Sequence, residues 1–219
     1  MTFRAYLKRH YATACKMQRG IGNDPVIVDM LRTGGQDAHL VKKWMESYRL
    51  FQGINAQERR KIVRTFLTFA KSHTRIRRVT EDDIRALYTE LFRALYRTKR
   101  QLWMSATSKL LWCLYPNDVV MYDSFVHRAL LVLQRIDSTL TVLPRIGDPP
   151  RVRVESDIDS LAEHYMNYQG MVHTLMRVHA GLLKDLRERT GERYPYDLRI
   201  VDKVLWMIGS PNPSIDGIE

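Results

Sequence analysis

Apolar residues recur every three or four positions along most of this chain, which is the spacing of one buried helix face. The first long series consists of Leu40, Val41, Trp44, Tyr48 and Phe51. Two further series follow the pairs Asn55–Glu58 and Thr80–Asp83. In such a pair each side chain satisfies a backbone N–H group at a helix start, and Thr80–Asp83 is the weaker version of this signal. The pattern therefore predicts helices that begin near residues 37, 55 and 80.

The same reasoning predicts helices elsewhere in the chain. They cover roughly Phe3–Arg19, Ser105–Tyr115, a segment from about Asp123, Asp157–Arg189 with Gly170 and Gly181 as candidate interruptions, and Tyr196–Ile208. The segment Gly20–Pro25 indicates a turn. Residues 142–154 contain proline, glycine and β-branched residues, which fit a short hairpin or none. We expect a mainly α, multi-helix globular fold, with residues 1–35 as an N-terminal extension or short helix, 36–209 as the helical domain, and 210–219 as a loose tail.

Composition narrows the class of protein. The 219 residues are 45% hydrophobic and 27% charged, so the chain can bury a core. Lys and Arg number 35 against 24 Asp and Glu, giving a net charge of +11. Such an excess favours a polyanionic partner, with nucleic acid ahead of an anionic membrane. No apolar run reaches the roughly 18 residues of a membrane-spanning helix, and the N-terminus lacks the apolar stretch of a secretory signal. We therefore expect a cytoplasmic protein, associated with the nucleoid if it binds DNA.

Several chemistries lack their residue patterns. Two cysteines cannot build a disulfide framework or a four-thiolate zinc site, and the seven histidines are scattered without ligand spacing. We expect each histidine to be satisfied in the core or exposed to solvent. Neither a phosphate-binding G-x-x-x-x-G-K-[ST] loop nor a G-x-S-x-G nucleophile elbow is present. We expect no metal and no cofactor.

Basic residues gather in three places. They are Arg59–Lys61 with Arg64, the set Arg75, Arg77 and Arg78, and the set Arg97, Lys99 and Arg100. Cations of this kind can hold phosphates without reading base sequence. A solvated rim explains them equally well, so both interpretations stay open.

The most informative window runs from Ser105 to Leu130. Lys109 lies in the first turns of an otherwise apolar helix, where both burial and the helix macrodipole disfavour an ammonium ion. An uncharged amine is what a lysine nucleophile requires. Asp123 is placed to cap the next helix, and capping alone explains it. A lysine that extends to solvent along its alkyl stem likewise explains Lys109.

This window resembles the catalytic core of the helix–hairpin–helix DNA glycosylases, the superfamily of 8-oxoguanine glycosylases and endonuclease III. In that family a lysine begins one helix and an aspartate heads the next, in a pattern like V-D-[ST]-x-[VI]-x-R. Here the segment from Tyr122 to Arg128, Y-D-S-F-V-H-R, looks like the second half, and Lys109 looks like the lysine. The order Ser108-Lys109, Pro116, Asp123 is also similar to divergent stand-alone bacterial members, some encoded near antiviral genes.

The chain departs from the family in two ways. The family hairpin, which reads L-P-G-[VI]-G and grips a phosphate, corresponds here to Lys99–Ser108, which has no glycine. The lysine and aspartate are 14 positions apart (123 minus 109), shorter than the common family spacing by about four residues, or one helical turn. The phosphate contacts would then come from Ser105, Ser108, Lys99 and Arg100, or from helix N-terminal amides.

The resemblance implies a DNA glycosylase with AP-lyase activity on a damaged or modified base. A nucleotide would be flipped out of duplex DNA. Asp123 would help to deprotonate Lys109, and Lys109 would form a Schiff base with the sugar, as a base-excision repair enzyme does. The alternatives are a non-catalytic nucleic-acid-binding module of the same fold and a protein whose basic face meets an acidic protein partner. The sequence names no protein partner, and a membrane partner is not expected.

Overall fold

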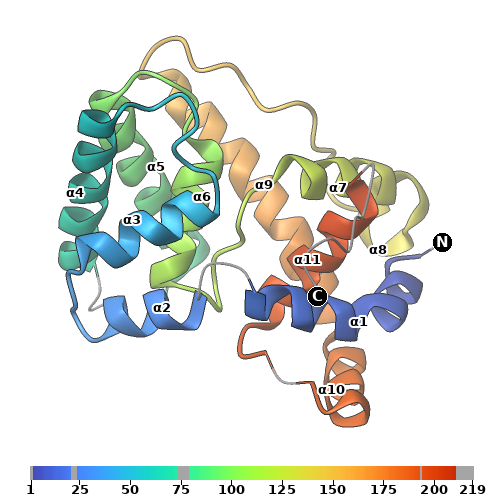
Figure 1. The fold of residues 1–219 in the computed structure, drawn as a ribbon. Coiled ribbons are helices and arrows are strands. Elements are labelled where there is room, and N and C mark those ends of the chain that lie inside the picture. The colour runs from blue at the N-terminus through green and yellow to red at the C-terminus, as the bar shows by residue number, and fades with distance from the viewer. Residues whose placement is uncertain (1, 21–23, 74–78, 193, 211–219) are drawn as a thin grey trace. The chain divides into compact units, whose positions relative to one another are not determined.

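The computed structural model describes residues 2–20, 24–73, 79–192 and 194–210, and this part of the chain is built from eleven helices without a strand (Figure 1). The mainly α fold expected from the apolar spacing is therefore confirmed. The helices divide between two compact units. The first unit comprises residues 1–20, 120–148 and 164–219, and the second comprises 21–119 and 149–163.

The first unit is organised around the last helix of the chain. Its helices are α1 (Phe3–Gly20), α7 (Ser124–Ile136), α8 (Ser138–Thr141), α10 (Ala180–Thr190), α11 (Asp197–Gly209) and the part of α9 (Asp157–Val178) from His164 onward. Helix α11 packs against both α7 and α1. Fully buried apolar side chains, among them Leu7, Leu130 and Val204, fill the space between these helices. Helix α1, which lies in the segment 1–35 expected as an N-terminal extension or short helix, thus belongs to this core.

The second unit contains α2 (Asp24–Arg32), α3 (Ala38–Ser47), α4 (Ala56–His73), α5 (Glu81–Thr98), α6 (Met104–Leu114) and the first turns of α9. Helix α5 packs against α4 and α6, and α2 packs against α3 and α6. The fully buried Asp24 joins two of these helices, because its carboxylate accepts hydrogen bonds from Trp44 Nε1 at 3.0 Å and from the Tyr48 hydroxyl at 2.7 Å.

The helix starts follow the capping signals of the sequence. Glu58 N donates to Asn55 Oδ1 at 2.9 Å while Asn55 N donates to Glu58 Oε2 at 3.2 Å. Thr80 and Asp83 form the same reciprocal pair at the start of α5. Both expected capping boxes are confirmed.

Three local expectations were wrong or are refined. Helix α1 extends to Gly20 and α2 begins at Asp24, so Asp24 and Pro25 do not form the expected turn, and residues 21–23 lie outside the described part. Proline is tolerated there because the first helical turn needs no backbone donor from it. The long span from Asp157 is interrupted at His179, and neither candidate glycine is the interruption: Gly170 lies inside α9 and Gly181 lies in the first turn of α10.

The remaining segments are irregular. Residues 142–156 contain turns and bends and no strand, so the hairpin alternative is absent there. Among the described residues, no helix is long and apolar enough to cross a membrane. The expected loose tail falls outside the described residues except for Ser210.

Candidate functional site

Lys109 lies in the middle of α6, the most apolar helix of the second unit. Its side chain is only 6% exposed, and its Nζ donates a hydrogen bond to Ser105 Oγ at 2.6 Å, one turn earlier in the helix. Every residue of α6 except Ser105 is buried. A primary amine is therefore held in apolar surroundings and directed at a neutral hydroxyl.

The segment that leads into α6 is fixed by hydrogen bonds to its neighbours. Trp103 Nε1 donates to the Lys99 carbonyl at 2.7 Å. The Lys99 ammonium in turn lies 2.8 Å from Glu58 Oε2 and 3.1 Å from the Gly53 carbonyl. The hydrogen bond from Lys99 lowers the pKa of the Glu58 carboxyl. Lys99, which the sequence suggested as a phosphate ligand, thus also ties the start of α6 to the start of α4.

The two serines proposed for phosphate contact face their own helix. Ser108 is fully buried, and its Oγ donates to the Ser105 carbonyl at 3.0 Å. The Ser105 hydroxyl accepts a hydrogen bond from the Lys109 amine. A phosphate oxygen would have to compete with these contacts to reach either hydroxyl.

Arg100 has a setting that suits an anion better. It is exposed and lines a cavity of about 290 Å³ together with Tyr96, Arg97, Arg153, Val154 and Glu155. Arg97 is paired with Glu155 at 2.6 Å, and the Tyr96 hydroxyl donates to the Arg153 carbonyl at 3.2 Å. Arg153 was missed by the sequence reasoning, since only the fold brings this distant loop residue beside Arg100. The cavity gathers three guanidinium groups, the side chain best suited to phosphate oxygens.

Asp123 belongs to the first unit and is the N-cap of α7. Its Oδ1 accepts a hydrogen bond from Phe125 N at 2.9 Å, so the expected capping role is confirmed. The preceding residue, Tyr122, is buried, and burial together with the carboxylates of Asp123 and Asp148 raises its pKa to about 12. Lys109 and Asp123 fall in different units.

Two histidines beside Tyr122 form a cluster that the sequence did not reveal. The rings of His127 and His164 have centroids 5.5 Å apart, and both rings contact Tyr122. His127 Nε2 lies 2.9 Å from the Gly147 carbonyl, whereas His164 Nε2 is buried and has no hydrogen-bond partner among the described residues. Burial lowers the pKa of both histidines. His164 is therefore neither satisfied at this atom nor exposed, contrary to the expectation for the histidines.

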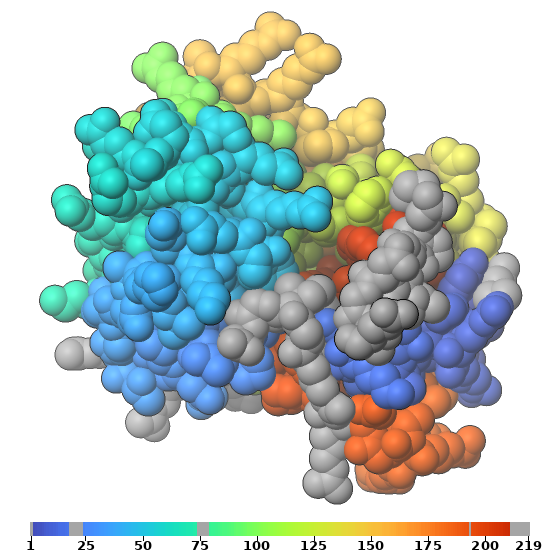
Figure 2. Space-filling view, in the orientation of Figure 1, coloured from blue at the N-terminus to red at the C-terminus, as the bar shows by residue number. Residues whose placement is uncertain are grey.

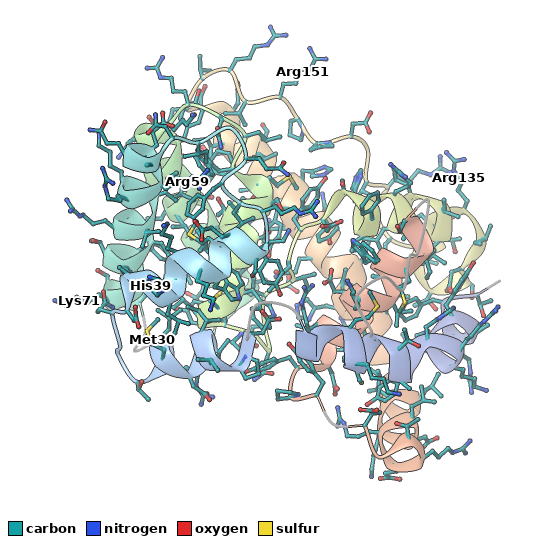
Figure 3. The ribbon with its side chains drawn as sticks, viewed as in Figure 1. Met30, His39, Arg59, Lys71, Arg135 and Arg151 are labelled. Carbon is teal, nitrogen blue, oxygen red and sulfur yellow. The ribbon has the colours of Figure 1, made fainter. Side chains whose placement is uncertain are left out.

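The other basic positions take different roles. Arg59, labelled in Figure 3, donates to the Ile54 carbonyl at 2.8 Å and lies over the Phe51 ring, so it is part of the local structure. Arg60 and Arg64 line a groove that is described below. Arg75, Arg77 and Arg78 lie outside the described residues. In the described part of the chain, no group of three His, Cys, Asp or Glu side chains could hold a metal ion.

The chain matches no known protein-family model, no curated protein and no solved structure. Its function therefore has to be argued from its own residues.

Proposed function

We propose that this protein is a DNA glycosylase with AP-lyase activity that removes a damaged or modified base through a Schiff base on Lys109. The observation that carries the proposal is the setting of Lys109, a 6% exposed amine on an apolar helix. Enzymes use lysine amines in apolar surroundings as nucleophiles that attack an electrophilic carbon. The resemblance of residues 105–130 to the helix–hairpin–helix glycosylases directs this amine to the sugar of a nucleotide.

The reaction begins when a nucleotide leaves the base stack, at a cost of a few kcal/mol. Lys109 Nζ attacks the anomeric carbon of the sugar, and the glycosidic bond breaks with its electron pair leaving on the base, which takes up a proton. The attached nitrogen then gives up one of its two protons, the C1′–O4′ bond breaks as O4′ takes up a proton, and the nitrogen that keeps one proton forms the iminium with C1′. Loss of a C2′ proton then expels the 3′ phosphate and cleaves the strand. We assign to Asp123 the role of accepting the proton of the amine and stabilising positive charge on the sugar.

The charge of the chain supports DNA as the substrate. The net charge of +11 favours a polyanion, and the cavity around Arg100 holds three guanidinium groups, of which Arg97 is paired with Glu155. Contacts between guanidinium groups and phosphates hold the backbone without reading the bases. We accordingly assign phosphate binding to Arg100 first, and to Lys99, Ser105 and Ser108 only where their present partners can be exchanged.

Borohydride trapping tests this proposal. The protein is incubated with duplexes that carry 8-oxoguanine, uracil or an abasic site, and reduction then fixes any Schiff base as a covalent adduct. We expect an adduct with the wild type and none with Lys109→Gln. Lys203→Gln is the matched control, because Lys203 is also only 6% exposed but lies on α11. An adduct that persists in Lys109→Gln contradicts the assignment of the nucleophile.

A non-catalytic nucleic-acid-binding module is the second candidate, and the basic cavity around Arg100 favours it. It predicts binding to DNA that falls steeply with salt and no adduct on any of the three duplexes. Asp123→Asn separates the candidates further. If the protein is the enzyme, Asp123→Asn loses trapping and still binds DNA. If it is a binding module, neither protein is trapped, and the variant differs from the wild type only in the stability lost with the helix cap.

A further inference from the structure

Helices α3 and α4 of the second unit border an open groove of about 720 Å³. Its lining residues are Gln36, Ala38, His39, Lys42, Arg60, Val63, Arg64, Leu67, Thr68 and Lys71. Side chains of both helices are visible on the face shown in Figure 2, in blue to teal. Figure 3 labels His39, at the start of α3, and Lys71, in the last turn of α4, and both labels stand at the lower left of the view. The groove lies wholly within one unit and shares no residue with the setting of Lys109.

The groove has an apolar floor and a cationic rim. Val63 and Leu67 are buried between the helices and form the floor. Lys42, Arg60, Arg64 and Lys71 stand on the rim and are exposed. No carboxylate is among the described residues that line it. A ligand that fits this groove therefore has an apolar surface on one side and negative charge on the other.

The rim cations of α4 are available for a partner. Arg60, Arg64 and Lys71 make no ion pair with any residue in the described part of the chain, although Lys42 pairs with Glu46 at 3.6 Å. Positions 60, 64 and 71 share one face of the helix. At about 1.5 Å per residue they span roughly 16 Å, or three helical turns. The row of charge is therefore as long as a short helix.

We propose that this groove binds an acidic amphipathic helix of a protein partner. Leucine-like side chains of that helix would pack on Val63 and Leu67, and its Glu or Asp residues would meet Arg60, Arg64 and Lys71. This is the helix-in-groove mode of peptide recognition, with specificity from complementary charge. A nucleic-acid strand fits less well for two reasons. Charged phosphates are not stabilised by contact with an apolar floor, and no Phe, Tyr or Trp is among the described lining residues to stack on a base.

Binding of a synthetic peptide tests the groove. The probe is a fluorescent helical peptide of about three to four turns with leucines on one face and glutamates on the other, and the comparison peptide has the same composition in shuffled order. We expect the patterned peptide to bind the wild-type chain and the shuffled peptide to bind at least about 10-fold more weakly. Equal binding of the two peptides overturns the proposal, since charge alone would then explain it.

Two kinds of variant locate the site. Arg60→Glu/Arg64→Glu reverses the rim, and we expect it to weaken binding of the patterned peptide by at least about 10-fold. Lys43→Glu/Lys61→Glu is the control, because it makes the same change of charge on the two helices that border the groove, with residues that do not line it. We expect the control to lose less than about 3-fold. Equal losses in the two variants contradict the assigned site.

Thr68→Trp separates a helix partner from nucleic acid. Thr68 is exposed in the groove, so an indole there fills the space above the floor without changing charge. We expect it to abolish binding of the patterned peptide and to leave the affinity for a single-stranded or duplex oligonucleotide unchanged. If the patterned peptide does not bind the wild type, and Arg60→Glu/Arg64→Glu but not Lys43→Glu/Lys61→Glu lowers the affinity for the oligonucleotide, the groove is a nucleic-acid contact and the proposal is wrong. Neither result depends on whether Lys109 is a nucleophile.

Discussion

Gly209, at the end of α11, lies so close to Phe125 of α7 that a Cβ atom on it would stand 1.8 Å from the Phe125 carbonyl oxygen. The same Cβ would be 3.0 Å from Ala129 N. The Gly209 carbonyl also accepts a hydrogen bond from Arg128 at 3.3 Å. Because the obstacle is backbone, no rotamer change can relieve it. The glycine thus permits the close crossing of α7 and α11 in the first unit.

Gly209→Ala should therefore lower the free energy of unfolding by at least about 2 kcal/mol, the effect of overpacking against an immobile backbone. Gly170→Ala is the matched control. Gly170 lies inside α9, and a Cβ there meets no heavy atom within 4 Å. Alanine should stabilise that helix by about 0.5–1 kcal/mol. Urea unfolding of both variants checks the pair, and a neutral Gly209→Ala would contradict the close crossing.

Arg199 and Asp202 form a buried ion pair within one turn of α11, with side chains 7% and 3% exposed. Residues three apart lie on the same side of a helix, so the two side chains can meet. Asp202→Asn should cost about 3–5 kcal/mol of the free energy of unfolding, because it leaves a guanidinium buried beside a neutral amide. Arg199→Met/Asp202→Leu removes both charges and should cost clearly less than the sum of the two single changes. Additive losses in this double-mutant cycle would show that the two side chains do not depend on each other.

The sequence predicted the helices well wherever a local signal marks them. The pairs Asn55–Glu58 and Thr80–Asp83 act over three residues, so their effect is readable without the fold. Helix α2 escaped prediction because it is short, carries the β-branched run Val26–Val28, and starts at Asp24–Pro25, which reads as a turn. What fixes Asp24 is its contact with Trp44 and Tyr48, which only tertiary structure supplies.

The candidate site was only partly readable for the same reason. The apolar surroundings of Lys109 and the capping by Asp123 follow from neighbours in the sequence. The engagement of Lys99 by Glu58 and the approach of Arg153 to Arg100 depend on contacts between distant segments. The cluster Arg59–Arg64 was read as one basic patch, yet the helix turns Arg59 toward Glu46 and Ile54 and places Arg60 and Arg64 on the groove.

The buried histidines make stability depend on pH. Burial lowers the folded-state pKa of His127 and His164 below the ordinary value of 6.5, and the charge of His127 lowers that of His164 further. Between the lowered pKa and 6.5 the unfolded chain binds more protons than the folded one. Above about pH 7 the two histidines are neutral in both states and cost no stability. The free energy of unfolding falls as the solution is acidified through this window, by up to about 1.4 kcal/mol per pH unit for each histidine.

His164→Phe should remove its share of this dependence. Phenylalanine keeps the contact with Tyr122 and eliminates the buried Nε2, so the variant should also be more stable than the wild type at pH 6. The melting temperature measured between about pH 5.5 and 7.5 checks both effects, and an unaltered slope in His164→Phe would refute the assignment. Asp197, whose pKa burial raises from 3.8, acts with the opposite sign at more acidic pH.

The hydrogen bond from Lys109 Nζ to Ser105 Oγ makes Ser105 a positioning residue for the proposed reaction. Ser105→Ala leaves the amine without this acceptor and should slow borohydride trapping by about 5- to 30-fold, the equivalent of about 1–2 kcal/mol. Ser105→Thr retains the hydroxyl and should restore most of the rate.

Thr107→Val supplies the control within the same helix. The Thr107 hydroxyl is buried and has no hydrogen-bond partner among the described residues, so valine removes an unsatisfied polar atom at nearly constant volume. We expect this variant to be at least as stable as the wild type and to trap at the wild-type rate. If Ser105→Ala and Thr107→Val slowed trapping equally, the effect would come from general disturbance of α6, and the specific contact between Ser105 and Lys109 would have no role in positioning the amine.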